Sequence, residues 1–252
     1  MSSKCHGRGI NKSFRLFHGL GDIAMLRSIV CFLMFALCLP VHAAEKPYLT
    51  HEQFNIIPFL PKPVANGSEE DKAQQAVVIA VQKSASAERI ALANSDSEET
   101  VYAMFGRVIG EKFKPESLPL TTQMFARLGE TEDAVVDPVK AHFGRIRPFM
   151  NNPEIKANVK PSKSGAYPSG HTSRSRMMAI ILSLMVPEHH DVIFARADDY
   201  AFSRIVGGMH YPNDLEAGKL AGTAMAATLL ADAQFRQDMQ AAKAELRKVL
   251  GL

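Results

Sequence analysis

Hydrophobic residues recur at three- and four-residue spacing from about residue 73 to the C-terminal end of this chain, and no stretch alternates convincingly at period two. This spacing is typical of amphipathic helices packed on one another and argues against a sheet. The longest apolar run after residue 43 covers about ten residues, whereas a helix that spans a bilayer needs about 20. The sequence therefore predicts one all-α domain, a single-domain helical bundle without a membrane span.

The periodicity also predicts where the helices lie. Ser68, with Asp71 three residues later, resembles a capping box at a helix start. Pro138 is expected to kink its helix or to lie near the helix start. Residues 48–64, rich in Pro and apolar side chains, are expected to form an extended arm that lies on the domain. The expected helices cover residues 73–92, 98–109, 120–128, 132–143, 169–186, 191–202, 212–230 and 235–250.

The first 43 residues have the features of a secretory leader. An apolar run at residues 29–39 follows Arg27, and the small-residue pattern of a signal-peptidase site follows at residues 41–43. The run is too short to span a bilayer comfortably, so a cleaved signal is favoured over a retained anchor or a buried core helix. We therefore expect a domain at residues 44–252 and a leader at residues 1–43.

Removing this leader changes the composition. The polar, basic region before Met25 is long for a leader, which favours translation from Met25, with residues 1–24 a misassigned start. All three cysteines precede residue 43, so the remaining domain has neither disulfides nor a thiolate site. The leader also carries five of the basic residues and one of the acidic residues, which leaves 24 basic against 25 acidic residues and a net charge of −1. This balance indicates no nucleic-acid-binding surface.

Three short segments carry candidate chemistry: KAHFGRIRP at residues 140–148, PSGH at 168–171, and SRIVGGMHYPND at 203–214. In the second segment, Ser169 is a natural N-cap for the apolar helix that follows. A helix N-terminus is a ready anion site, and Gly170 lets the backbone approach a ligand closely. His171 would then lie beside the anion, although a helix start with a surface histidine is an equally good reading of this segment alone.

The third segment places a carboxylate one turn beyond a histidine. Asp214 could accept the Nδ1 proton of His210 and leave Nε2 free as a nucleophile, as the orienting acid does in catalytic triads. The alternative is a helix-capping Asp beside a loop His; the Gly207-Gly208 pair favours the functional interpretation.

The first segment and Arg204 supply positive charge. Lys140 at a helix end and Arg147 before Pro148 could both contact phosphate oxygens, whereas Arg145 is a lesser candidate that could pair with an acid instead. Residues 189–191 (HHD) resemble metal ligands, but adjacent residues rarely chelate one ion, so we expect no metal site.

Together these positions match the signature K-x6-RP, PSGH, SR-x5-H-x3-D, and the chain thereby resembles the type 2 phosphatidic acid phosphatase (PAP2) superfamily, which includes the vanadium haloperoxidases. The size, the leader and the GAYPSGHT context make it most similar to the bacterial class A nonspecific acid phosphatases. Those enzymes typically have Ser where Ala166 stands and often Cys where Val206 stands. The resemblance implies the acid phosphatase/vanadium-dependent haloperoxidase fold.

The resemblance also implies roles for the residues. His210 would attack phosphorus and form a phosphohistidine, His171 would protonate the leaving group and then activate water, and Asp214 would orient His210. The phosphate oxygens would be held by Lys140, Arg147, Ser169, Gly170 and Arg204.

The function implied is a metal-independent, cofactor-free acid phosphatase that hydrolyses small phosphate monoesters, with phosphotransfer to alcohols as a side activity. An acidic optimum follows because His171 must be protonated. The family implies a homodimer, and the leader implies the periplasm of a Gram-negative bacterium. The alternatives are a vanadate-dependent haloperoxidase, although those enzymes are generally much longer, and a non-catalytic phosphate-binding protein, which would not need His210 with Asp214. A membrane lipid phosphatase would need several spanning helices.

Overall fold

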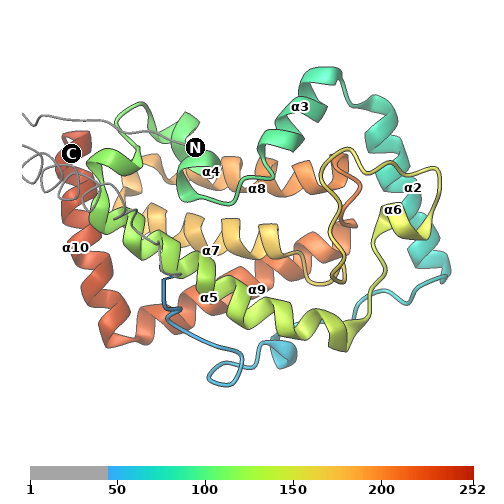
Figure 1. Cartoon of the computed structure of the whole chain (residues 1–252), viewed down its shortest axis with the longest axis horizontal. Coiled ribbons are helices and arrows are strands. Elements are labelled where there is room, and N and C mark those ends of the chain that lie inside the picture. The colour runs from blue at the N-terminus through green and yellow to red at the C-terminus, as the bar shows by residue number, and fades with distance from the viewer. Residues whose placement is uncertain (1–44) are drawn as a thin grey trace, which may run out of the picture. The chain divides into compact units, whose positions relative to one another are not determined.

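Helices make up the regular secondary structure of residues 45–252, the part of the chain that the computed structural model describes, and no strand occurs in that part (Figure 1). The all-α prediction is therefore confirmed. The leader predicted at residues 1–43 and the start predicted at Met25 lie outside the described residues. No helix in the described part is long and apolar enough to cross a membrane.

Within residues 45–252, the helices are connected by loops, the longest of which covers residues 152–169 between α6 and α7, and by three 3₁₀ turns, at Ile57–Phe59, Pro115–Ser117 and Pro187–His189. The α-helices are α2 (Glu69–Ser84), α3 (Ala87–Ser95), α4 (Val101–Ile109), α5 (Pro119–Phe143), α6 (Pro148–Asn151), α7 (Gly170–Met185), α8 (His190–Val206), α9 (Pro212–Ala231) and α10 (Ala233–Leu250).

The helix predicted at residues 73–92 is in fact two helices, α2 and α3. The backbone of Ala85 is extended, with ψ of 126°, and ends α2. The Ser86 side chain then accepts the Arg89 backbone N–H at 3.2 Å and caps α3. The prediction was wrong here because apolar spacing continues across the break, whereas the serine side chain competes for backbone hydrogen bonds and starts a new helix.

The two helices predicted at residues 120–128 and 132–143 are one helix, α5, with Pro138 inside it. The expected interruption around Gly129 is absent because tertiary contacts support the helix there. The Gly129 carbonyl accepts a hydrogen bond from Arg174 of α7 at 3.2 Å, and Thr131 Oγ1 accepts one from the Tyr48 backbone N–H at 2.9 Å. Neither partner is visible from local spacing.

The N-terminal arm and the first cap behave largely as expected. Ser68 Oγ accepts the Asp71 N–H at 3.1 Å and caps α2, but the Asp71 carboxylate accepts from Gly67 N–H rather than completing the box with Ser68. The arm follows the domain surface, with one 3₁₀ turn, and buries Ile56 completely. Its Pro61 carbonyl accepts the Tyr167 hydroxyl at 2.6 Å.

Helix α7 lies at the centre of the domain and packs against α5, α8 and α9 (Figure 1). Two glycines of α9 allow the closest of these contacts. A Cβ on Gly218 would lie 2.8 Å from the Ser169 carbonyl oxygen, and one on Gly222 would overlap the Ser173 carbonyl oxygen. The N-terminal ends of α7 and α9 are therefore held side by side. The surrounding core is apolar and includes Phe105, Phe125, Leu128, Met177, Ile181, Met225 and Phe235.

Candidate active site

Three segments that are distant in sequence meet at the N-terminus of α7. The Ser169 backbone N–H donates to the Asp214 carbonyl oxygen at 3.0 Å and joins the start of α7 to the start of α9. A Cβ placed on Gly170 would lie 3.2 Å from Lys140 Nζ, so the end of α5 reaches the same point. The three predicted segments therefore converge on one region, as the sequence pattern indicates.

His210 is buried at this point and is held through both ring nitrogens. Its Nδ1 lies 2.8 Å from the Ala166 carbonyl oxygen, and its Nε2 lies 3.1 Å from Arg147 Nη1. A carbonyl can only accept a hydrogen bond and a guanidinium can only donate one. The proton must therefore lie on Nδ1, which leaves the lone pair on Nε2. The Ala166 contact requires the proton on Nδ1, and the Arg147 contact excludes a proton from Nε2, so the two together specify the neutral tautomer.

The surroundings of His210 also keep it neutral. Burial lowers the pKa of His210 well below its ordinary value, and the positive charges of Arg147, Arg204 and Lys140 lower it further. A neutral imidazole with a free lone pair is the form that acts as a nucleophile.

Asp214 does not hold His210 in the way that the sequence predicts. Its Oδ2 atom lies 3.6 Å from His210 Nδ1 and accepts the Tyr211 backbone N–H at 2.8 Å. Nδ1 donates its hydrogen bond to the Ala166 carbonyl oxygen instead, because that oxygen lies closer to Nδ1, at 2.8 Å. Burial raises the pKa of Asp214 to about 7. The carboxylate thus caps α9 and lies near the imidazole without bonding to it directly.

Arg147 organises the loops around His210. Its Nε donates to the Ser164 carbonyl at 2.8 Å, and its Nη2 donates to the Gly165 carbonyl at 3.1 Å. Its Nη1 contacts both the Met209 carbonyl, at 3.1 Å, and His210 Nε2. With a further bond from Nη2 to Ser164 Oγ at 3.1 Å, all five N–H groups of Arg147 already donate within the protein. A hydrogen bond from Arg147 to phosphate would therefore have to replace one of these bonds, such as the one to His210 Nε2.

Arg204 and Lys140 supply the remaining positive charge. Arg204 Nη1 donates to Ser97 Oγ at 3.3 Å, whereas its buried Nε has no hydrogen-bond partner within the described residues. Lys140 Nζ pairs with Asp137 Oδ1 at 2.6 Å. The charge of Arg204 lowers the pKa of both His171 and His210, which places this side chain near both rings.

The start of α7 has the features of an anion site. Ser169 Oγ accepts hydrogen bonds from the Thr172 backbone N–H, at 3.4 Å, and from the Thr172 hydroxyl, at 3.0 Å, which confirms the predicted N-cap. The hydroxyl proton of Ser169 therefore stays free to donate. The first N–H groups of this helix and its positive dipole end favour an anion next to Gly170.

His171 has a partner that sequence reasoning missed. Its Nδ1 lies 3.0 Å from Glu99 Oε1, in the turn before α4, and its Nε2 has no hydrogen-bond partner within the described residues. Burial lowers the pKa of His171 to about 4, with a contribution from the positive charge of Arg204. Only the acidic pair Glu98-Glu99 was visible in the sequence, and nothing local connects it with a residue about 70 positions later.

Arg145, the lesser phosphate candidate, pairs with an acid. Its Nη2 lies 2.7 Å from Asp71 Oδ1, and both side chains are buried. Its guanidinium also lies over the Tyr211 ring, 4.1 Å from the centroid. Arg145 therefore ties the start of α2 to the start of α9 and has no free face for a ligand there.

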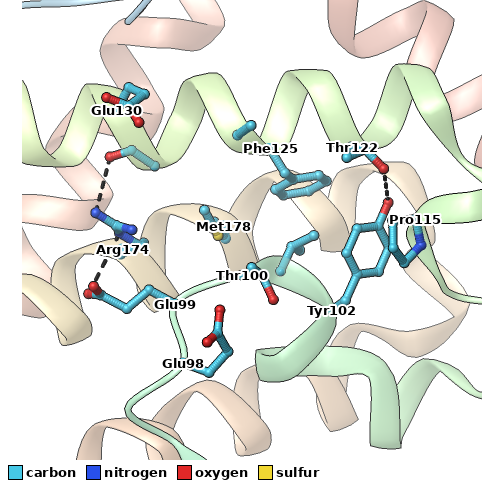
Figure 2. A pocket seen from close by; sticks show the side chains of 13 residues that line it. Glu98, Glu99, Thr100, Tyr102, Pro115, Thr122, Phe125, Glu130, Arg174 and Met178 are labelled. Carbon is cyan, nitrogen blue, oxygen red and sulfur yellow. Dashed lines mark hydrogen bonds and ion pairs between the residues drawn. The ribbon is translucent and has the colours of Figure 1, made fainter. Parts of the chain in front are cut away.

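A cavity of about 460 Å³ lies beyond Glu99, between α4, α5 and α7 (Figure 2). Figure 2 shows Glu99 and Arg174 at one end and Tyr102 at the other, with Phe125 and Met178 between them. The predicted phosphate ligands do not line it. Glu99 and Arg174 line the cavity, and Glu99 also contacts His171 of the candidate site.

The three residues at 189–191 do not form a metal site. His190 Nδ1 lies 2.9 Å from Asp191 Oδ1, and both side chains are largely exposed. Among residues 45–252, no group of three or more His, Cys, Asp or Glu side chains is arranged to hold a metal ion.

Comparison with known proteins supports the predicted resemblance. Residues 128–238 match the model of the PAP2 superfamily, and every predicted site residue lies inside that segment. The match to the PAP2 superfamily that the signature predicts is therefore confirmed for this segment. It is 35% identical to a non-specific acid phosphatase of Providencia stuartii over 149 residues, which cover 58% of this chain and 59% of the relative.

Further relatives have similar names. An acid phosphatase of Zymomonas mobilis is 32% identical over 167 residues, which cover 64% of this chain and 63% of the relative. A non-specific acid phosphatase of Salmonella typhi is 29% identical over 157 residues, covering 60% and 62%. The matched part thus spans about three fifths of each relative. Among solved structures, a transmembrane PAP2 type phosphatidylglycerolphosphate phosphatase from Bacillus subtilis aligns with a TM-score of 0.49 and 14% identity, over 64% of this chain and 85% of that chain.

Proposed function

We propose that residues 44–252 form an acid phosphatase domain, which hydrolyses small phosphate monoesters through a phosphohistidine at His210. The observation that carries the proposal is the state of His210: a buried, neutral imidazole whose Nε2 lone pair faces Arg147 among positive charges. A phosphate-binding protein would need the cations but not a nucleophile held in this tautomer. The names of the relatives, which are acid phosphatases, agree with this function.

The reaction would proceed in two steps. In the first step, His210 Nε2 bonds to phosphorus as the bond to the leaving oxygen breaks, and His171 Nε2 gives that oxygen a proton. In the second step, water attacks phosphorus, His171 accepts its proton, and the nitrogen–phosphorus bond breaks. An alcohol in place of this water would receive the phosphoryl group. The charge on the equatorial oxygens would be stabilised by Lys140, Arg147, Ser169, Gly170 and Arg204.

The chain supplies every group that these two steps use, so the proposal includes no metal and no cofactor. The apolar run at residues 29–39 and the site at 41–43 support cleavage of a leader and export of the domain. We therefore place the enzyme in the periplasm.

The test is hydrolysis of p-nitrophenyl phosphate from acidic to neutral pH in EDTA, with the His210→Ala variant beside the parent protein. EDTA-resistant turnover that disappears in the variant is the expected result. Inorganic phosphate that binds without any turnover of the ester would instead indicate a binding protein, and peroxide-dependent halide oxidation after addition of vanadate would indicate a haloperoxidase.

A further inference from the structure

We propose that Glu99 is the positioning residue of the proton-transferring histidine: it fixes the tautomer of His171 and stabilises its imidazolium form. The inference rests on the proposed phosphatase function and adds a residue that lies outside the family signature and outside the segment matched by the family model. Glu99 contacts His171 and not the reacting phosphate, so its effect would pass through the histidine.

The contact assigns different tasks to the two ring nitrogens of His171. Nδ1 lies 3.0 Å from Glu99 Oε1, so a proton on Nδ1 is shared with the carboxylate. Nε2 is buried and has no partner within the described residues, so it is the nitrogen that can exchange a proton with a substrate. The His171 ring also stacks on Tyr200, with centroids 5.9 Å apart and planes 18° apart, which limits its rotation.

The charges around His171 explain why a carboxylate is needed. Burial disfavours a positive imidazole most, and the charges of Arg204 on α8 and Arg174 on α7 add to its effect. His210 lies near enough to interact as well. The carboxylate of Glu99 is the group that opposes them by direct contact. Without it, the pKa of His171 would fall further, and a smaller fraction of the ring would carry the proton that a leaving alkoxide needs.

Four other ionisable groups lie near His171: two acidic groups that pair with Arg174, one lysine and one tyrosine. On α5, Glu132 and Asp133 pair with Arg174 at 3.1 and 2.6 Å. Lys140 lies beside Gly170, the residue that precedes His171. The phenol of Tyr200, on α8, has a pKa raised by burial and stays neutral.

Arg174 keeps Glu99 in place. Its Nε lies 3.9 Å from Glu99 Oε1, and its Nη2 donates to the Gly129 carbonyl at 3.2 Å (Figure 2). The guanidinium also pairs with Glu132 and Asp133, and these contacts hold it against α5. The same Glu99 atom, Oε1, therefore lies near both the guanidinium of Arg174 and Nδ1 of His171. These two contacts define the orientation of the carboxylate.

The two proposed steps then leave the Nδ1 proton where it is. His171 Nε2 loses its proton to the leaving oxygen in the first step and regains one from water in the second step. Throughout, Nδ1–H donates to Glu99, so the ring never needs to flip or to change tautomer. The carboxylate stabilises the charged form before the first step and after the second.

The experiment compares Glu99→Gln with Glu98→Gln in the full chain. Glu98 is the exposed neighbour in the same loop, and its side chain makes no hydrogen bond within residues 45–252, so this control removes the same charge without contacting His171. Each variant is assayed with p-nitrophenyl phosphate, whose phenolate leaves without a proton, and with glycerol 2-phosphate, whose alkoxide needs one. Glu99→Asp is included to test whether a shorter carboxylate restores activity.

We expect Glu99→Gln to lower kcat/KM for glycerol 2-phosphate about 10- to 100-fold more than for p-nitrophenyl phosphate, within the range that general acid catalysis contributes. The limb of the pH profile on which activity falls with rising pH should move to lower pH. Glu98→Gln should match the parent protein, and Glu99→Asp should restore part of the alkyl ester activity. Equal losses on both esters with an unchanged pH profile would overturn the proposal.

A second measurement does not depend on turnover. Nitrogen-15 NMR of the His171 ring should show the proton on Nδ1 in the parent protein and a lower titration midpoint in Glu99→Gln. A proton on Nε2, or an unchanged midpoint, would overturn the role of Glu99 even in an active enzyme. A parent protein that turns over neither ester but shows the Glu99-dependent midpoint would contradict the proposed function alone.

Discussion

The two histidines of the site lie in opposite surroundings. His210 is almost fully buried, with 3% of its side chain exposed, and its Nδ1 faces the neutral Ala166 carbonyl. His171 is 20% exposed, and its Nδ1 faces the carboxylate of Glu99. In both rings Nδ1 has an acceptor, so Nε2 is the nitrogen left for the proposed reaction with a substrate. The difference between them is the charge of that acceptor.

The acceptor at Nδ1 thus adapts one residue type to two tasks. A carbonyl dipole orients an imidazole but offsets little of the cost of a buried positive charge, so His210 stays neutral, as the proposed nucleophile must. A carboxylate orients the ring and also stabilises its protonated form, which the proposed proton transfer by His171 requires. Arg147 strengthens the contrast because it donates to His210 Nε2 and excludes a proton from that atom.

The largest expected effect comes from removing the nucleophile. His210→Asn keeps a donor for the Ala166 carbonyl but has no Nε2, so we expect turnover to fall about 10⁴-fold or more and no phosphoenzyme to form. His171→Asn should still form a phosphoenzyme from p-nitrophenyl phosphate and accumulate it, because the second step loses its base. Detection of acid-labile protein-bound phosphate separates the two. Phosphoenzyme in His210→Asn would contradict the assignment.

Arg147→Lys is expected to have the next largest effect. Lysine keeps the charge but cannot reach the Ser164, Gly165 and Met209 carbonyls together, and it loses the fork that meets His210. We expect kcat/KM to fall about 100-fold and the free energy of unfolding to fall by about 2–4 kcal/mol, because buried carbonyls lose their donors. Kinetics with urea denaturation would check both. A variant with full stability and full activity would show that the charge alone matters.

Asp214→Asn should have a smaller effect than the orienting acid of a catalytic triad, whose loss lowers kcat about 10⁴-fold. Because Nδ1 of His210 already donates to Ala166, we expect a loss of about 10- to 100-fold, caused mainly by the altered α9 cap and the missing charge. Steady-state kinetics on one ester are sufficient. A 10⁴-fold loss would mean that Asp214, and not the carbonyl, holds the nucleophile.

The smallest expected effect is on stability against pH. The pKa values of His210 and His171 are lowered in the folded protein, so below about pH 6.5 the unfolded chain binds protons that the folded protein does not. These two histidines therefore contribute a loss of stability as the pH drops from about 6.5 toward 4, by at most about 1.4 kcal/mol per pH unit for each. The buried carboxyls Asp214 and Glu132, whose pKa values are raised to about 7 and about 8, contribute in the opposite direction. Relative to the parent protein, His210→Asn should therefore raise Tm more at acidic pH than at neutral pH. The same change in Tm at both pH values would show that His210 is not buried neutral.

Much of the fold could be predicted from the sequence because helical periodicity is a local property. The end of α4 at Ile109 and the start of α7 after Ser169 follow from apolar spacing and a serine cap. The breaks were harder to predict. The continuation of α5 through Gly129 depends on a distant partner, Arg174. The end of α2 at Ala85 depends on one hydrogen bond to the Ser86 side chain, which starts the next helix.

The helical class, the three site segments and the residue types that a phosphate needs could be predicted from the sequence, because they depend on spacing and chemical identity along the chain. The acceptor of each histidine depends instead on tertiary packing. Ala166 and Glu99 come to the two rings from distant positions, and the carbonyl of Ala166 belongs to the backbone, so its side chain carries no signal. The tautomer and charge of an imidazole depend on contacts within about 3 Å, and such contacts arise from packing rather than from order in the sequence.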